Sequence, residues 1–236
     1  MHRIRTITLD LDDTLWPITP VIKRAERALW AWLAEHYPRI PAKWDRASAA
    51  RLRASVVADH PDRSHDLRFL RQSVLARMAA SCDYDVALVD PAFAVFDEQR
   101  NEVELFPDVE SGLSRLRATC RLIALTNGNA SLEKIGIRHL FDDVITAVAA
   151  GAAKPSPKIF ELACERAAAL PEEVLHVGDH PHLDVDGARA AGMRTAWVNR
   201  NGESWPSELT GPDATVTCMN ELADWLLPLI KKQEQH

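Results

Sequence analysis

Two groups of acidic side chains stand far apart in the sequence, each directly after a short apolar run. Asp10 and Asp12 follow the first run, and Asp179 and Asp184 follow a much later one. Because side chains alternate along a strand, Asp10 and Asp12 project to the same side if the first strand continues to its end. Carboxylates at the carboxyl end of parallel strands lie where such sheets bind ligands. Taken alone, however, an acidic turn after a strand is more often a solvated loop.

Two further segments carry groups that suit an anionic ligand. Thr126-Asn127-Gly128 offers a hydroxyl, an amide and a glycine that permits close backbone approach. Lys154 precedes a proline, which favours an extended backbone over a helix and places the lysine at the mouth of the predicted sheet. Each feature also has a simpler interpretation, since Asn-Gly is a common turn and most lysines lie on the surface.

The acidic residues predict a metal ion if they converge. Two carboxylates about 4 Å apart repel each other by about 4 kcal/mol at an effective dielectric constant of about 20. Three such pairs among Asp10, Asp179 and Asp184 would strain a domain whose stability is only about 5–15 kcal/mol. A divalent cation removes the conflict, and an all-oxygen site suits Mg²⁺ better than zinc.

Three histidines near the second acidic group suggest zinc as an alternative. His176 lies inside the predicted strand, and the His180-Pro181-His182 segment has no evident helical or hairpin frame. We therefore expect structural or solvent-exposed roles for these histidines, with substrate contact by His180 as the alternative.

The elements that must position these residues follow from short apolar runs alternating with helical patterns. From about residue 106 onward, strands and helices alternate, which is typical of an α/β fold with a parallel sheet. Residues 16–104 contain no convincing strand and instead predict an all-helical insert, so we expect a core of 1–15 and 105–236 around it. The tail, 231–236, is expected to fray. The predicted strands are 4–11, 122–126, 144–148, 174–177 and 195–198, and the predicted insert helices are 20–36, 45–59, 64–80 and one from Asp90-Pro91 to about 102.

Composition excludes several broad classes of protein. The chain has 236 residues, 47% of them hydrophobic and 26% charged, which is an ordinary globular balance. Its net charge of −6 gives no broad electrostatic footprint for nucleic acid or an anionic membrane. There is no apolar run of membrane-spanning length and no apolar stretch typical of a signal peptide near the start. We expect a cytoplasmic location and reduced, buried cysteines.

Taken together and in order, the motifs resemble a known family. The segments DLDDTLW, TNG, the lysine of AKPSPKIF and GDHPHLD are similar to the four motifs of the haloacid dehalogenase-like hydrolase superfamily. The helical insert resembles the cap of its subfamily I members. This resemblance, which covers nearly the whole chain, implies a Rossmann-like α/β core with an inserted helical cap domain, and Mg²⁺ as cofactor.

The resemblance also implies a role for each motif residue. Asp10 would be the nucleophile that forms an aspartyl-phosphate, and Asp12 would be the general acid and base. The backbone carbonyl of Asp12 would also bind the metal. Thr126, the Asn127 backbone and Lys154 would hold the phosphoryl oxygens. Asp10, Asp179 and Asp184 would hold the metal. His180 stands where many members have Ser or Asn, so the division of metal binding between Asp179 and Asp184 stays open.

The expected activity is hydrolysis of a small phosphorylated metabolite. Dehalogenases of the family typically have an aromatic residue where this chain has Asp12, so a phosphatase is favoured over a 2-haloacid dehalogenase. A phosphomutase and a non-catalytic scaffold remain alternatives, and the oligomeric state is open.

The substrate is expected to be chosen by the insert. The chain is similar to bacterial phosphatases acting on flavin mononucleotide and on ribitylaminouracil phosphate, with sugar or nucleotide phosphates as the main rival. Lys23, Arg24 and Arg27 on the first insert helix are candidates for substrate contact, although a solvated helix face is the simpler interpretation. The tryptophans of the insert are more often core residues than a stacking platform.

Overall fold

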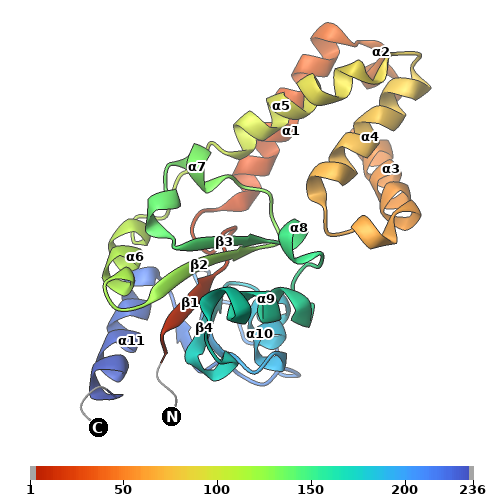
Figure 1. Ribbon diagram of the computed structural model, residues 1–236. Coiled ribbons are helices and arrows are strands. Elements are labelled where there is room, and N and C mark those ends of the chain that lie inside the picture. Colours follow the sequence, from red (N-terminus) through yellow and green to blue (C-terminus); the bar gives the residue numbers. More distant parts are fainter. Residues whose placement is uncertain (1–3, 234–236) are drawn as a thin grey trace. The chain divides into compact units, whose positions relative to one another are not determined.

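The computed structural model describes residues 4–233 and divides into two compact units (Figure 1). The α/β unit comprises the residues up to Pro17, Glu104–Gly128 and those from Gly136 onward, and the helical unit comprises Ile18–Val103 and Asn129–Ile135. The prediction of an α/β fold with a helical insert between the first two strands is confirmed. The exact division of the chain into core and cap at residues 15 and 105 stays a prediction.

The α/β unit is built on a six-stranded sheet in which every neighbouring pair is parallel. The order across the sheet is β3-β2-β1-β4-β5-β6. Leu9, the last residue of β1, pairs with Ala124 of β2 on one side and Val177 of β4 on the other, so the first and fourth strands are direct neighbours of each other. The strands are β1 (Thr6–Leu9), β2 (Arg121–Thr126), β3 (Asp143–Thr146), β4 (Val174–Gly178), β5 (Arg194–Val198) and β6 (Ala214–Val216).

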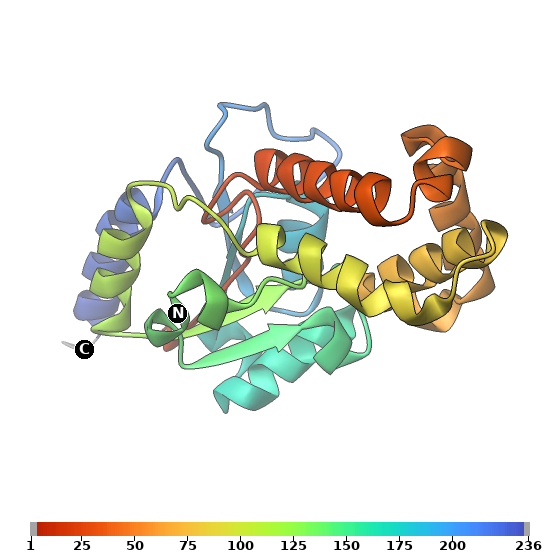
Figure 2. The ribbon, with the colours of Figure 1, turned by 90° about the horizontal axis from the view of Figure 1, so that it is seen from above.

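Helices cover both faces of this sheet. Figures 1 and 2 show α6 (Val109–Arg117) and α11 (Met219–Gln233) side by side on one face, and α9 (Pro157–Ala167) and α10 (Gly187–Ala190) on the other. Cover on both faces explains why every residue of β1 and β4 is buried, the threonines of β1 included. The remaining short helices of this unit are η3 (Arg138–Leu140), α8 (Ala147–Ala150), η4 (Pro171–Glu173) and η5 (Pro181–Asp186).

The strand boundaries differ from the prediction at several places. β1 covers only Thr6–Leu9 instead of 4–11, and β3 ends at Thr146 instead of residue 148. The hydroxyl of Thr146 accepts a hydrogen bond from the Ala149 backbone and so begins α8, which takes Val148 out of the strand. β6 was not predicted. The tail was expected to fray from residue 231, but α11 continues to Gln233, and residues 234–236 lie outside the described part.

The helical unit encloses a separate apolar core. α1 packs against α5, and α3 and α5 each pack against α4 around buried side chains that include Leu29, Leu33, Met78 and Phe96. The four predicted insert helices are confirmed. The helices of this unit are α1 (Ile18–His36), α2 (Arg39–Lys43), α3 (Arg46–Asp59), η1 (Pro61–Arg63), α4 (Leu67–Ser81), η2 (Val86–Leu88), α5 (Val89–Arg100) and α7 (Leu132–Ile135).

Two details of the helical unit were not foreseen. The fourth helix was predicted to begin at Asp90-Pro91, but the Asp85 side chain caps η2, which runs directly into α5 at Val89. Asp90 therefore lies in the first turn of α5 and accepts a hydrogen bond from Gln72 instead. Residues 129–135, expected in the core, belong to the helical unit because Asn101 accepts the Ser131 backbone N–H.

Within residues 4–233, no helix has the combined length and apolar character that crossing a bilayer requires.

The contact between α6 and α11 requires a glycine at position 112. A Cβ placed on Gly112 would lie 2.5 Å from Met219 Cβ and 2.6 Å from its carbonyl carbon. Backbone that close cannot move aside without shifting a whole helix, and both helices help to bury the sheet.

We expect Gly112→Ala to lower the free energy of unfolding by about 1–3 kcal/mol, the usual range for overpacking a core. Urea denaturation followed by circular dichroism measures this change. Gly211→Ala is the matched control, because nothing lies within 4 Å of a Cβ there and its backbone angle is ordinary. Equal stability of the two variants would contradict the packing argument.

Candidate active site

The first strand delivers one buried and one partly exposed carboxylate. β1 ends at Leu9, and Asp10 stays beside β4 through a hydrogen bond of 2.9 Å from its backbone N–H to the Val177 carbonyl. Asp10 is only 7% exposed. Two residues later Asp12 Oδ1 accepts a hydrogen bond of 3.0 Å from the Trp16 indole. The strand therefore stops short of the two carboxylates, and the turn after it determines where Asp12 lies.

The fourth strand delivers the second pair. Asp179 follows the last residue of β4, and the indole of Trp197 on β5 donates to its carbonyl at 2.7 Å. Asp184 lies in η5, a π-helical turn, and its Oδ2 accepts the backbone N–H of His180 at 2.9 Å. Gly178 is needed at the strand exit, because a Cβ there would overlap the Asp184 carboxylate. The π-helical turn folds Asp184 back over the end of its own strand.

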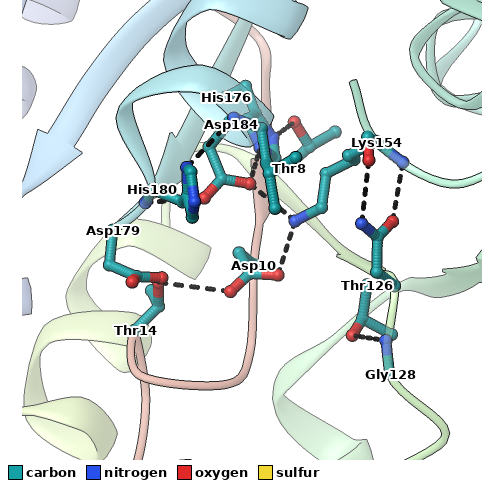
Figure 3. A network of polar contacts seen from close by, with 12 residues as sticks. Thr8, Asp10, Thr14, Thr126, Gly128, Lys154, His176, Asp179, His180 and Asp184 are labelled. Carbon is teal, nitrogen blue, oxygen red and sulfur yellow. Dashed lines mark hydrogen bonds and ion pairs between the residues drawn. The ribbon is translucent and has the colours of Figure 1, made fainter. Parts of the chain in front are cut away.

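Among the described residues, the carboxylates of Asp10, Asp179 and Asp184 form a cluster that could hold a metal ion (Figure 3). Their ligand atoms all lie within 4.8 Å of one another. The predicted convergence of the first and fourth strand ends is therefore present. The Asp12 carboxylate is not a member of this cluster, which leaves only its backbone carbonyl for the metal role that the family resemblance implies.

Lys154 is buried between two of these carboxylates and is not a surface lysine. Its side-chain nitrogen lies 2.5 Å from Asp10 Oδ1 and 2.6 Å from Asp184 Oδ1, and the residue is 4% exposed. Figure 3 shows the ammonium group between the two acids. Three ionised carboxylates and one ammonium group together carry a net charge of −2.

The Thr126-Asn127-Gly128 segment fixes the backbone of Lys154. The Asn127 amide donates to the Lys154 carbonyl at 3.0 Å and accepts its N–H at 2.7 Å. Thr126 is buried at the end of β2, and its hydroxyl oxygen accepts the Gly128 N–H at 2.8 Å. Since that bond uses only a lone pair, the hydroxyl hydrogen can still be donated to a ligand. The Asn127 side chain thus positions the lysine, a role beyond the backbone contact expected from the sequence.

A buried histidine completes the support of Asp184. The ring of His176 on β4 lies between Thr8 Oγ1, 2.8 Å from Nδ1, and Asp184 Oδ1, 3.2 Å from Nε2. The ring is closed off by Phe160 of α9, with centroids 5.3 Å apart. Sequence reasoning assigned His176 only a structural role in the strand. The detectable signal was a polar side chain at a position where both sheet faces are buried.

A second group of hydrogen bonds holds Thr14 beside Asp179. The Thr14 hydroxyl donates to Asp179 Oδ1 at 3.2 Å, and the Arg200 guanidinium donates twice to the Thr14 carbonyl. Arg200 in turn forms a bidentate pair with Asp108 at 2.9 Å and lies over the Phe106 ring. No sequence pattern connects residues so distant in the chain.

In the described part of the chain, the rings of the other two histidines make no hydrogen bond to the carboxylate cluster, although the His180 backbone N–H donates to Asp184. The ring nitrogen of His180 accepts the backbone N–H groups of His182 and Leu183, so His180 caps η5. The expectation that this segment lacks a helical frame was wrong, because Pro181 at the first position and the His180 cap together begin a helical turn. Within residues 4–233, the acidic cluster offers carboxylate oxygens, and no zinc-type set of histidines is found.

Burial and like charges control the protonation of the acids. Burial raises the pKa of Asp10 well above its usual range, with Lys154 opposing and the other two acids adding to the rise. Burial and the charges of Asp184 and Asp13 raise the pKa of Asp179 to about 7. Burial would raise the pKa of Asp184 as well, but Lys154 and His176 hold it well below its usual range. Without a bound cation, the cluster retains protons at pH values where carboxylates are normally ionised.

Comparison with known proteins agrees with this geometry. Residues 4–192 match the family model of haloacid dehalogenase-like hydrolases. The 5-amino-6-(5-phospho-D-ribitylamino)uracil phosphatase YigB of Escherichia coli K12 is 32% identical over 89% of this chain and 91% of its own length. A glyceraldehyde 3-phosphate phosphatase from Methanopyrus kandleri is 32% identical over 84% of each chain.

A solved structure of the same fold is described with a different activity. The crystal structure of a 2-haloacid dehalogenase from Pseudomonas syringae pv. tomato DC3000 aligns with a TM-score of 0.91 and 35% identity, covering 96% of this chain and 99% of that one. The family model spans most of the chain, and both phosphatase relatives align over nearly their whole length. This chain belongs to the haloacid dehalogenase-like hydrolases.

Proposed function

We propose that this protein is a Mg²⁺-dependent phosphatase that hydrolyses a small phosphate monoester through an aspartyl-phosphate on Asp10. The convergence of Asp10, Asp179 and Asp184, with the buried Lys154 paired to the first and the last, is the observation that carries this proposal. The relatives described as phosphatases support it, because their substrates are small phosphorylated metabolites.

The proposed reaction has two steps, transfer of the phosphoryl group to Asp10 and hydrolysis of the resulting aspartyl-phosphate. An Asp10 carboxylate oxygen attacks phosphorus while the ester oxygen leaves, and Asp12 gives that oxygen its proton. Asp12 then removes a proton from water, whose oxygen attacks the same phosphorus. This second attack breaks the bond to Asp10 and releases inorganic phosphate. The Trp16 indole that donates to Asp12 holds the carboxyl in place for both transfers.

The groups around the nucleophile suit the charge of a transferring phosphoryl group. Lys154 stays protonated, since Asp10 and Asp184 raise its pKa although burial alone would lower it. The hydroxyl of Thr126 and the backbone at Asn127 supply neutral donors beside this cation. Fixed donors and charges that need no rearrangement are the most effective way to stabilise such a transition state.

The acidic cluster fits Mg²⁺ by the chemistry of its donors. Asp10, Asp179 and Asp184 would hold the ion, together with the Asp12 carbonyl, and all are hard oxygen ligands of the kind Mg²⁺ prefers. A bound divalent cation would neutralise the remaining charge of −2 and polarise the phosphoryl oxygens. The Thr14 hydroxyl and the His180 N–H then orient Asp179 and Asp184 from outside.

Asp12 is the observation that favours a phosphatase over a dehalogenase. An alkoxide leaving group needs a proton, whereas a halide does not, and Asp12 is the carboxyl next to the nucleophile that can supply one. The similar structure described as a 2-haloacid dehalogenase keeps that activity as the second candidate. For the substrate, a ribitylaminouracil or flavin phosphate is our first choice, with sugar or nucleotide phosphates next. A phosphomutase or a scaffold is less favoured, and the cytoplasmic location stays a prediction.

Hydrolysis of p-nitrophenyl phosphate with Mg²⁺ and with excess chelator tests the proposal directly. We expect turnover that is lost with chelator and restored by Mg²⁺, and no release of chloride from 2-chloropropionate. Asp10→Asn should abolish turnover with an unchanged circular dichroism spectrum. Turnover that chelator does not affect would contradict the metal requirement. Wild-type rates in Asp10→Asn would contradict the assignment of Asp10 as the nucleophile.

Replacing Asp12 should slow poor leaving groups most. We expect Asp12→Asn to lower kcat for an alkyl phosphate by about 10²–10⁴-fold, the usual contribution of general acid–base catalysis. The loss should be smaller for p-nitrophenyl phosphate, whose leaving group needs little protonation. Steady-state kinetics across phenyl phosphates of graded acidity measures this. A uniform loss across the series would argue against an acid role for Asp12.

Loss of the Asp179 proton should reduce the stability of the metal-free protein as pH rises. With a folded-state pKa of about 7 against an ordinary 3.8, Asp179 binds its proton more tightly in the folded state. The resulting loss of stability grows above pH 4 and is complete above pH 7. In chelator, Asp179→Asn should therefore gain about 1–3 kcal/mol over wild type between pH 5 and 8.

Thermal unfolding of the two proteins at each pH measures this difference. Burial lowers the pKa of His176 and so acts in the opposite direction, but it acts in both proteins and cancels. Saturating Mg²⁺ should stabilise the wild type and shrink the difference. A stability difference that stays constant from pH 5 to 8 would show that Asp179 does not titrate in this range.

A further inference from the structure

The helical unit contains a cavity that the proposed hydrolysis does not use. Its volume is about 430 Å³, within the range of about 300–1,000 Å³ typical of small-molecule sites. α1, α3, α4 and α5 all contribute to its wall. Its apolar lining includes Leu29, Leu33, Val74, Leu75, Met78 and Phe96.

Positive side chains gather around this apolar lining. Lys23, Arg46, Arg53 and Arg71 all line the cavity, together with a single acid, Glu26. Glu26 is already paired with Arg71 at 2.8 Å, and the Arg71 guanidinium lies over the Phe96 ring at 3.4 Å. The acid is therefore neutralised from within the wall.

The other three cations have no such partner. Within residues 4–233, neither Lys23, Arg46 nor Arg53 has an acidic side chain within ion-pair distance. Several other cations of the same unit are paired with acids, as in Arg63–Asp66, Arg77–Asp59 and Lys134–Asp97. The chain has a net charge of −6, so this local group of unpaired positive charges stands out from the rest of the protein. Together with the apolar lining, it is complementary to an anion that also has an apolar part.

We propose that this cavity binds a small organic anion whose apolar, ring-sized body fills the lining and whose carboxylate, sulfonate or phosphate group meets Arg46 and Arg53. A free inorganic anion would leave the apolar wall uncovered, and a neutral ring would leave the rim unpaired. Trp30 also lines the cavity, and its indole N–H has no acceptor among the described side chains and backbone groups. The indole adds a flat face and a donor for a ring with polar substituents.

Two fluorescent probes of nearly the same shape separate charge from apolar binding. 1-Anilinonaphthalene-8-sulfonate carries an anion, and N-phenyl-1-naphthylamine is its neutral counterpart. Both are titrated into the full chain in chelator and without phosphate ester, so that neither catalysis nor metal binding contributes. Arg46→Gln/Arg53→Gln removes two rim charges, while Arg63→Gln/Arg77→Gln removes two paired charges of the same unit outside the cavity.

The rim variant should weaken binding of the sulfonate about fivefold, as expected for two exposed charge contacts, and leave the neutral probe within about twofold. The control variant should change neither. Ala50→Phe, which places a ring at the cavity wall, should weaken both probes. Equal weakening of the sulfonate by the control variant would show that only net charge matters, and unchanged binding in Ala50→Phe would place the probes elsewhere. Either result overturns the proposal.

Discussion

The site of the α/β unit depends on one constraint, the convergence of three carboxylates, of which Asp10 and Asp184 are buried against one ammonium group. Lys154 offsets one negative charge, which leaves the ionised cluster two charges short of neutrality in a place where water is largely excluded. Protons or a divalent cation must make up the difference. Burial and the nearby negative charge of Asp184 raise the pKa of Asp179. Lys154 and His176 instead keep Asp184 ionised.

The sheet order explains why these groups meet. β1 lies between β2 and β4, and the chain continues outward from β2 to β3 on one side and from β4 to β5 and β6 on the other. The point where strand order reverses is where open α/β sheets leave a crevice at their carboxyl ends. Asp10 leaves β1 and Asp179 leaves β4 on the two sides of that point, with Thr126 at the end of the neighbouring β2.

Much of this arrangement could be predicted because it depends on local rules. Apolar runs that end in Asp10 and Asp179 mark buried strands, and a proline after Lys154 keeps it out of a helix. Parallel strands then bring their carboxyl ends together without further information. The residues that support the site followed no local rule. His176, Arg200 and the Asn127 side chain act through partners from distant segments, so only the folded chain reveals their contacts.

The element boundaries that were predicted incorrectly also depend on contacts that the spacing of apolar residues does not reveal. One capping bond begins α8 directly after β3, and another begins η2, which continues into α5, but the spacing of apolar residues is compatible with either boundary. β6 has three residues, too few for an alternating pattern to stand out. Asp10 and Asp12 were expected to project to the same side of the first strand. That expectation required the strand to continue through Asp12, but β1 ends at Leu9, before both residues. Periodicity locates elements, whereas side-chain hydrogen bonds set their ends.

The two units therefore face different electrostatic problems. The α/β unit concentrates negative charge, which a cation would balance, and under the proposed function its reaction is confined to one group, a phosphoryl. Nothing in Asp10, Lys154 or Thr126 can distinguish one ester from another, because each would contact only phosphate oxygens. The helical unit has the opposite character, since its apolar cavity is bordered by Arg46 and Arg53, whose charge is opposite to that of the acidic cluster. An anion with an apolar body suits the helical unit, whereas a divalent cation suits the acidic cluster.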